Sequence, residues 1–259
     1  MYDVPAKMNR GGLIQALAAE QGLVCMVGAG GKKTTMYRLA SLHAGRVGIT
    51  STVFIPPPPA ALEAKCVIAP EPHLLDAVLK LAPHHRTLFF AQPSDKPGRF
   101  GGVSRSCIAQ IHRQAMLDVT FIKADGARSR WLKAPAEDEP QIPGDASTVI
   151  PVVSALALGR PLDESIAHRV DRLASVMGIN RGELILPPHL ARLIADERGA
   201  LKHAGEATVV PLINMVDDPE HERLAQVVAR AALARSSRFE RVVLAAMRKP
   251  EPLVAVVTR

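Results

Sequence analysis

Short apolar runs alternate with longer amphipathic stretches along the 259 residues of the chain. The runs are rich in Val, Ile and Leu, and several lack polar alternation, which is typical of strands buried on both faces. The longer stretches carry apolar residues at helical spacing. This pattern predicts strands at 23–27, 47–51, 66–69, 87–91, 119–123, 148–153, 208–213, 242–246 and 253–257, and helices at 34–43, 72–81, 104–115, 163–177, 188–195 and 219–233.

The βα rhythm predicts a single α/β domain over residues 1–259, with three layers like a P-loop NTPase. Its sheet should be predominantly parallel, with helices on both faces. Residues 163–205, which are late and helical, are a candidate for an inserted helical subdomain. We expect loops at three segments, residues 56–59, 92–102 and 125–144.

The first predicted strand and helix are joined by the turn Gly28-Ala29-Gly30-Gly31. Glycine reaches positive φ without a Cβ penalty, so successive backbone amides of this turn can converge on an anion. The N-terminus of the following helix adds partial positive charge at the same place. The turn therefore predicts a phosphate-binding loop, with ATP or GTP as its ligand.

The residues after the turn supply candidate side-chain ligands. Lys32 or Lys33 would contact the β- and γ-phosphates, and the hydroxyl of Thr34 or Thr35 would bind Mg²⁺. The match to GxxxxGK[ST] is imperfect, because Met26 stands at the first glycine and Lys33 at the metal-binding Ser or Thr. Either Thr34 takes that role after a shift of one residue, or the metal is held differently.

Two other interpretations of the turn stay open. Gly28 and Gly30 begin a GxGxxG pattern, which would indicate a dinucleotide-dependent oxidoreductase. The third glycine falls at Lys33, however, and the second strand ends in Thr50-Ser51-Thr52 where an Asp or Glu should bind the ribose. A hydroxyl of this triplet could instead sense a γ-phosphate. The simplest alternative is a glycine turn with solvated lysines.

The predicted strand 119–123 leads into Asp125 and a glycine. Parallel strands bring their C-terminal ends to one edge of a sheet, so Asp125 should lie beside the phosphate loop and help to order Mg²⁺. Arg128 and Arg130 follow as candidate cations for the transition state of phosphoryl transfer. An ordinary Asp-Gly turn with solvated arginines is the alternative.

Asn214-Met215-Val216-Asp217 follows an apolar strand, where an NKxD motif would read guanine. Met215 replaces the lysine, so GTP and ATP both stay open. Asp217 is equally plausible as the N-cap of the helix that begins near Pro219.

Composition narrows the classes of partner. The net charge is +7 and the pI is about 9.6, but the basic residues are scattered along the chain. The 6 Phe, 2 Tyr and 1 Trp offer few surfaces on which bases could stack, which disfavours nucleic acid as a partner.

Cys25, Cys66 and Cys107 are isolated, so neither a disulfide framework nor a zinc site is indicated. The apolar run 148–158 is too short to span a bilayer. We expect a cytoplasmic protein with no membrane partner.

Four segments in this order, GAGGKKTTMYRLA, KADGARSRWLKAPAEDEPQIP, LGRPLDESIAHR and PLINMVDD, resemble the selenium-dependent hydroxylase accessory protein family, YqeC. The resemblance covers about residues 22–234. It implies a P-loop nucleotide-binding protein that assists maturation of selenium-dependent molybdenum hydroxylases, with such a hydroxylase or its selenium-containing cofactor as partner. It also implies site roles for Gly28, Gly30, Gly31, Lys32, Asp125, Gly126, Lys133 and Glu137, and the family's His-Arg pair recurs at His168-Arg169.

The chain departs from the family pattern at Lys123, where Glu is common, at Asp138, where His is common, and at Lys33, where Thr is common. The expectation of Mg²⁺-dependent hydrolysis or phosphoryl transfer therefore stands beside a non-hydrolysing module in which nucleotide switches contact with a partner. The predicted site comprises catalytic Lys32, Asp125 and Arg128, nucleotide-binding Gly28, Ala29, Gly30, Gly31, Lys32, Lys33, Thr34, Thr35, Asn214 and Asp217, and metal-binding Thr34 and Asp125.

Overall fold

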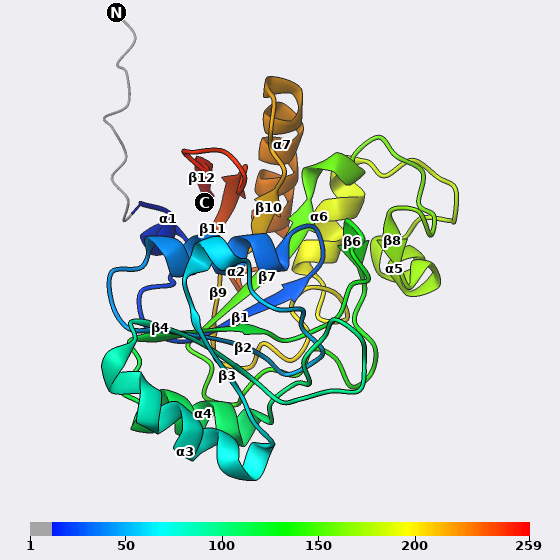
Figure 1. Ribbon diagram of the computed structural model, residues 1–259. Coiled ribbons are helices and arrows are strands. Elements are labelled where there is room, and N and C mark those ends of the chain that lie inside the picture. Colours follow the sequence, from blue (N-terminus) through cyan, green and yellow to red (C-terminus); the bar gives the residue numbers. More distant parts are fainter. Residues whose placement is uncertain (1–11) are drawn as a thin grey trace, which may run out of the picture.

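The computed structural model describes residues 12–259, so the first eleven positions of the predicted domain lie outside the described residues. Helices and strands alternate along most of the chain (Figure 1). The helices are α1 (Gly12–Ala16), α2 (Lys32–Leu42), α3 (Glu71–Leu81), α4 (Arg105–Gln114), α5 (Val170–Met177), α6 (Pro187–Ala195) and α7 (Pro219–Arg235). The strands are β1 (Gly22–Gly28), β2 (Val47–Ser51), β3 (Lys65–Ile68), β4 (Thr87–Ala91), β5 (Val119–Lys123), β6 (Leu132–Lys133), β7 (Thr148–Ser154), β8 (Ala167–His168), β9 (Thr208–Val209), β10 (Leu212–Asn214), β11 (Arg241–Ala245) and β12 (Leu253–Thr258).

The main sheet has the order β12-β11-β10-β7-β1-β5-β2-β4-β3, and β9 also pairs with β7. Every pairing within it is parallel except that of β11 with β12. Strand β1 is central and lies between β5 and β7, so the C-terminal ends of these three strands meet at one edge. The predicted three-layer α/β fold with a predominantly parallel sheet is confirmed.

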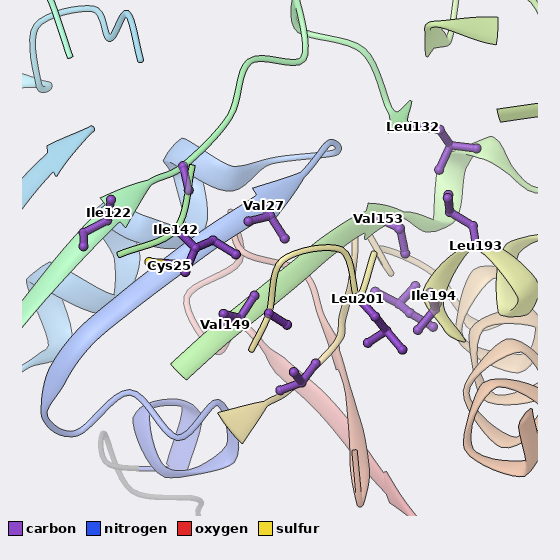
Figure 2. Packing of buried hydrophobic residues seen from close by; sticks show 14 of the residues in the cluster. Cys25, Val27, Ile122, Leu132, Ile142, Val149, Val153, Leu193, Ile194 and Leu201 are labelled. Carbon is purple, nitrogen blue, oxygen red and sulfur yellow. The ribbon is translucent and has the colours of Figure 1, made fainter. Parts of the chain in front are cut away.

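Alternate residues of β1 face the two helical layers. Val24 and Met26 pack with α1 and α2, whereas Cys25 and Val27 belong to the core beneath α3, α4 and the later helices. In Figure 2, Val153 of β7 lies beside Leu193 of α6 within this second core. Burial on both faces explains why the strands read as continuous apolar runs.

Two predicted elements are wrong in extent. The helix expected at 163–177 begins only at Val170, because Arg169 has a left-handed φ of 64° and the residues before it form turns and β8, which pairs with β6. Asp163 accepts a hydrogen bond from the Ser165 amide at 2.8 Å in such a turn and does not cap the helix. The strand expected at 208–213 is divided into β9 and β10, since Pro211 has no amide hydrogen to donate to the ladder.

Two further differences are smaller. The short helix α1 was not predicted, and the loop expected at 125–144 contains β6. Within 163–205, α5 packs on α6, and α6 packs on α7. The division of this region as an inserted subdomain stays a prediction. No helix in the described part of the chain is long and apolar enough to cross a membrane.

Candidate functional site

The turn after β1 is shaped by glycine. Gly28, Gly30 and Gly31 have φ values of 85°, 84° and 120°, which side-chain-bearing residues rarely adopt. A Cβ on Gly30 would lie 2.7 Å from the backbone nitrogen of Ser154, and one on Gly31 would lie 2.3 Å from Nδ2 of Asn214. The chain therefore passes close to the ends of β7 and β10 before α2 begins.

The backbone amides available to an anion lie further along the chain than the glycine turn that the sequence predicted. Gly28 donates to Asp125, Ala29 to the Val152 carbonyl at 2.9 Å and Gly30 to the Arg130 carbonyl at 3.1 Å. Within residues 12–259, no group accepts a hydrogen bond from the amides of residues 31–34. These four amides at the N-terminus of α2 are the donors that remain for an anion.

The N-terminus of α2 opens onto a cleft of about 730 Å³. Among the described residues, its wall carries eight cationic side chains and one carboxylate, that of Glu139. Such a balance is typical of a polyanion site. The cations are Lys32, Lys33, Lys96, Arg99, Lys123, Arg128, Arg130 and Arg248.

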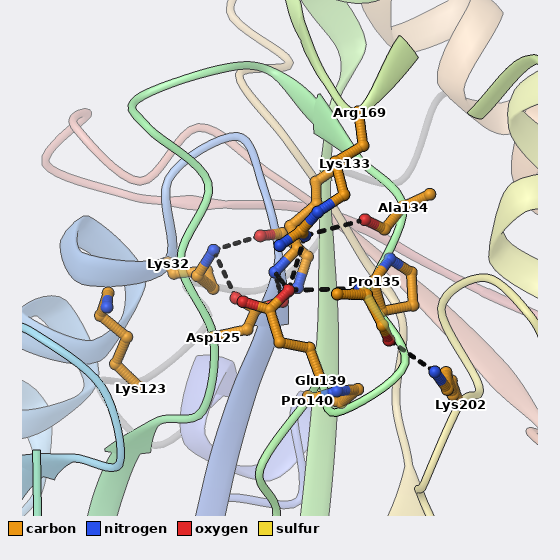
Figure 3. Close-up of polar contacts among 12 residues, drawn as sticks. Lys32, Lys123, Asp125, Lys133, Ala134, Pro135, Glu139, Pro140, Arg169 and Lys202 are labelled. Atoms are coloured by element: carbon orange, nitrogen blue, oxygen red, sulfur yellow. Dashed lines mark hydrogen bonds and ion pairs between the residues drawn. The ribbon is translucent and has the colours of Figure 1, made fainter. Parts of the chain in front are cut away.

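Asp125 lies directly behind the glycine turn, as the order of β1 and β5 requires (Figure 3). Its side chain is 2% exposed. Oδ1 is 2.8 Å from Nζ of Lys32, and Oδ2 is 2.9 Å from both the Gly28 amide nitrogen and Nζ of Lys133. Lys32 also donates to the Gly28 carbonyl. Burial lowers the pKa of Lys32, and the neighbouring carboxylate of Asp125 opposes that shift.

The ion pairs continue away from the loop. Lys133 is 2.6 Å from Oε2 of Glu139, and Arg169 contacts the same oxygen at 2.6 Å. Burial alone would raise the pKa of Glu139, but the hydrogen bonds from Lys133 and Arg169 lower it to about 2. We call Lys32, Asp125, Lys133, Glu139 and Arg169 the buried ion cluster.

The sequence did not predict a functional role for Glu139 or for Lys123. Glu139 is one of three acids in the run EDE, and the run has no feature that distinguishes it. The predicted Glu137 is instead exposed, 3.7 Å from Arg172.

Lys123 ends β5, is 7% exposed and donates to the Phe54 carbonyl at 2.8 Å. Burial, followed by the charges of Lys32, Lys133 and Lys33, lowers its pKa to about 7, although Asp125 opposes the change. Lys33 is half-buried, and its pKa is lowered by burial and then by Arg99.

The two threonines differ. Thr34 is half-buried and lines the cleft. Thr35 is buried, and its hydroxyl donates to the Gly31 carbonyl at 3.1 Å. The hydroxyls of Thr50 and Ser51 are also engaged, with the carbonyls of Phe90 and Lys123, so neither is presented to the cleft.

Asn214 supports the loop from behind. Its Nδ2 donates to the Gly30 carbonyl at 2.8 Å, and its Oδ1 accepts from the Met247 amide at 3.2 Å. Asp217 is exposed and does not line the cleft. The N-cap of α7 is its neighbour Asp218, so the capping role considered for Asp217 is wrong.

Arg128 and Arg130 are exposed and line the cleft, with Ala29 and Trp131 beside them. His168 lies in β8 next to Lys133 of β6, and Arg169 belongs to the buried ion cluster. Apart from Asp217 and Glu137, the predicted site residues thus converge on one edge of the sheet.

The arrangement does not fit a magnesium ion held by Thr34 and Asp125. Both oxygens of Asp125 face lysine ammonium groups, which would have to leave before a metal could bind. Lys33 occupies the place of the usual metal-binding hydroxyl. Among residues 12–259, no group of three His, Cys, Asp or Glu side chains is placed to hold a metal ion.

Comparison with known proteins gives two matches. The family model described as YqeC protein matches residues 24–171, which is more than half of the chain. A curated protein of Escherichia coli (strain K12), described as "Uncharacterized protein YqeC", is 29% identical over 184 residues, or 70% of each chain. The residues matched by the family model include the glycine turn and the whole buried ion cluster.

Proposed function

Because the chain belongs to the YqeC family, and because a basic cleft surrounds its phosphate loop, we propose that it binds a nucleoside triphosphate, ATP or GTP. The observation that carries this proposal is the charge balance of the cleft. Eight cations and one carboxylate surround the four free amides at the N-terminus of α2. A triphosphate supplies several negative charges to this arrangement, whereas a neutral ligand would leave the cations facing one another.

The size of the cleft supports a nucleotide. Its volume of about 730 Å³ falls within the range of roughly 300–1,000 Å³ that is usual for small-molecule sites. Phe54 lines the same cleft and is 48% exposed, which makes it a surface on which a base can stack. Asp217 lies outside the cleft, so it gives no support to a specific preference for GTP.

In the proposed complex, the amides of residues 31–34 and Lys32 bind the phosphates. Lys32 exchanges Asp125 for a phosphate oxygen by rotating about its side-chain bonds. Arg128 and Arg130 approach from the rim, where they neutralise the outer phosphate.

Two outcomes of binding are open to this site. Hydrolysis or phosphoryl transfer would use Lys32 and Arg128 to stabilise developing charge, with Asp125 placing the loop through its hydrogen bond from Gly28. The second candidate is a module that binds nucleotide without turnover. The ion pairs at Asp125 and Glu139 favour it, because neither carboxylate is free to activate water.

We further propose that the nucleotide-bound protein acts on a molybdenum hydroxylase, or on its selenium-containing cofactor, during maturation. The family resemblance alone supports this step.

Calorimetric titration of ATP, GTP and CTP, together with an assay for released phosphate, tests the proposed function. We expect a triphosphate to bind, and Lys32→Ala and Arg128→Ala to weaken it by about tenfold each. Lys80→Ala removes an exposed charge from α3 and is the matched control, with unchanged affinity expected. Phosphate release would support the enzyme, and binding without release the switching module. If NADPH binds and no triphosphate does, the proposal is wrong.

A further inference from the structure

The residue after the phosphate-loop lysine has a defined task in GxxxxGK[ST] loops. Its hydroxyl binds the magnesium ion that bridges the β- and γ-phosphates. In this chain the position is Lys33, in the first turn of α2, half-buried and on the wall of the cleft. An ammonium group cannot bind a metal ion, but it can contact phosphate oxygens directly.

A second ammonium group reaches the same space from the sheet. Lys123 is 7% exposed, lines the cleft and leads toward Asp125 at the end of β5. Figure 3 shows Lys123 on the side of Lys32 that faces away from the buried ion cluster. Its ammonium group donates a hydrogen bond to the Phe54 carbonyl, and the described residues offer it no ion pair with a carboxylate. A buried ammonium group without an anionic partner is costly, and an incoming anion relieves that cost.

The carboxylates near the cleft are already occupied. Asp125 contacts Lys32 and Lys133, and Glu139 contacts Lys133 and Arg169. Among residues 12–259, the cleft therefore presents eight positive side chains to a divalent cation and no carboxylate that is free of an ion pair.

Building on the proposed function, we infer that this cleft takes the metal-free form of a triphosphate, and that Lys33 and Lys123 replace the divalent cation as its charge partners. The chemical class of ligand is an uncomplexed polyphosphate ester, with inorganic triphosphate as its simplest analogue. Magnesium then competes for the ligand and weakens binding.

The test is a titration of the wild-type protein with ATP and with inorganic triphosphate, in excess EDTA and in excess MgCl₂. We expect both ligands to bind more tightly in EDTA than in MgCl₂. Lys33→Thr removes an ammonium group, so it should weaken binding in EDTA by about tenfold, about 1.4 kcal/mol. It also provides the usual metal-binding hydroxyl, so this variant should bind the ligand more tightly in MgCl₂ than in EDTA. Lys123→Gln should weaken binding in EDTA similarly, whereas the control Lys80→Gln should leave it unchanged.

Two results would overturn the inference and are distinct from each other. Binding that is as tight in MgCl₂ as in EDTA, or tighter, would disprove metal-free recognition while the proposed triphosphate site stands. The absence of binding under both conditions would remove the proposed function together with the inference. The comparison of conditions on the wild-type protein needs no variant, so it holds even if a substitution impairs folding.

Discussion

Replacement of Asp125 with asparagine tests whether the buried ion cluster is organised by charge. Asparagine has nearly the same shape and can still accept the hydrogen bond from the Gly28 amide, so the change removes a charge and leaves no cavity. The wild-type cluster contains three cations and two carboxylates. After the substitution, Glu139 is the one carboxylate left in the cluster to balance three cations. Lys32 loses the carboxylate oxygen that lies 2.8 Å from its Nζ.

The expected destabilisation is about 3 kcal/mol, the lower end of the roughly 3–5 kcal/mol observed when one partner of a buried ion pair is removed. The lower end applies because the asparagine oxygen can still accept from one lysine. Natural domains are stable by about 5–15 kcal/mol, so the loss is large enough to measure.

Urea unfolding followed by circular dichroism measures the free energy of unfolding of each variant. Asp145→Asn is the control, because Asp145 pairs with Arg113 at 3.1 Å at the surface, where its side chain is 52% exposed. We expect a loss of less than about 1 kcal/mol there. The double variant Asp125→Asn/Lys32→Met should be more stable than the sum of its single changes, since it removes the stranded ammonium. If Asp125→Asn stays within about 1 kcal/mol of wild type, the account of the cluster is wrong.

The remaining predictions concern the loop and the acid end of the cluster. Gly31→Ala should cost about 2 kcal/mol or more because of its φ of 120° and the contact with Asn214; Gly144→Ala, which meets open space, is the control for the same urea measurement. Asn214→Ala should lower the free energy of unfolding by about 1–3 kcal/mol, because it leaves the Gly30 carbonyl unpaired. In the Asn214→Ala background, Gly31→Ala should be less destabilising than in the wild type, and a double-mutant cycle measures this difference. Glu139 has a folded pKa of about 2, below the ordinary glutamate value of 4.5, so its stabilisation of the fold, about 3 kcal/mol, should be present above pH 4.5 and lost as the pH falls toward 2. Acid titration of Glu139→Gln should lack that loss, and an unchanged acid transition would contradict the assignment.

The sequence predicted the loop and its acidic neighbour for physical reasons that the fold preserves. A strand buried on both faces, a glycine turn and a helix are local features with their own spacing. The position of Asp125 then follows from the parallel arrangement, because β5 ends at the same edge as β1. The extents of α5 and β10 were less predictable, since a left-handed residue and a proline interrupt patterns that otherwise continue.

Only part of the wall of the cleft could be predicted from the sequence. Lys96, Arg99 and Arg248 come from loops after β4 and β11, and their approach to α2 depends on how those loops fold. The two-residue strands β6 and β8 have no periodicity to detect, yet their pairing brings Lys133 close to Arg169. Ion pairs between residues far apart in the sequence could therefore not be predicted from the sequence alone.

The charge count of the buried ion cluster explains how Lys32 can serve both the protein and a ligand. Asp125 can remain paired with Lys133, and Glu139 with Arg169, when Lys32 turns away. Lys32 is thus the surplus cation, and its transfer to a phosphate oxygen leaves no carboxylate unneutralised. Substitution of the two partners of this 2.8 Å contact should therefore have different effects. Loss of Lys32 should affect ligand binding more than stability. Loss of Asp125 should affect stability first, because it leaves ammonium groups buried without an anion.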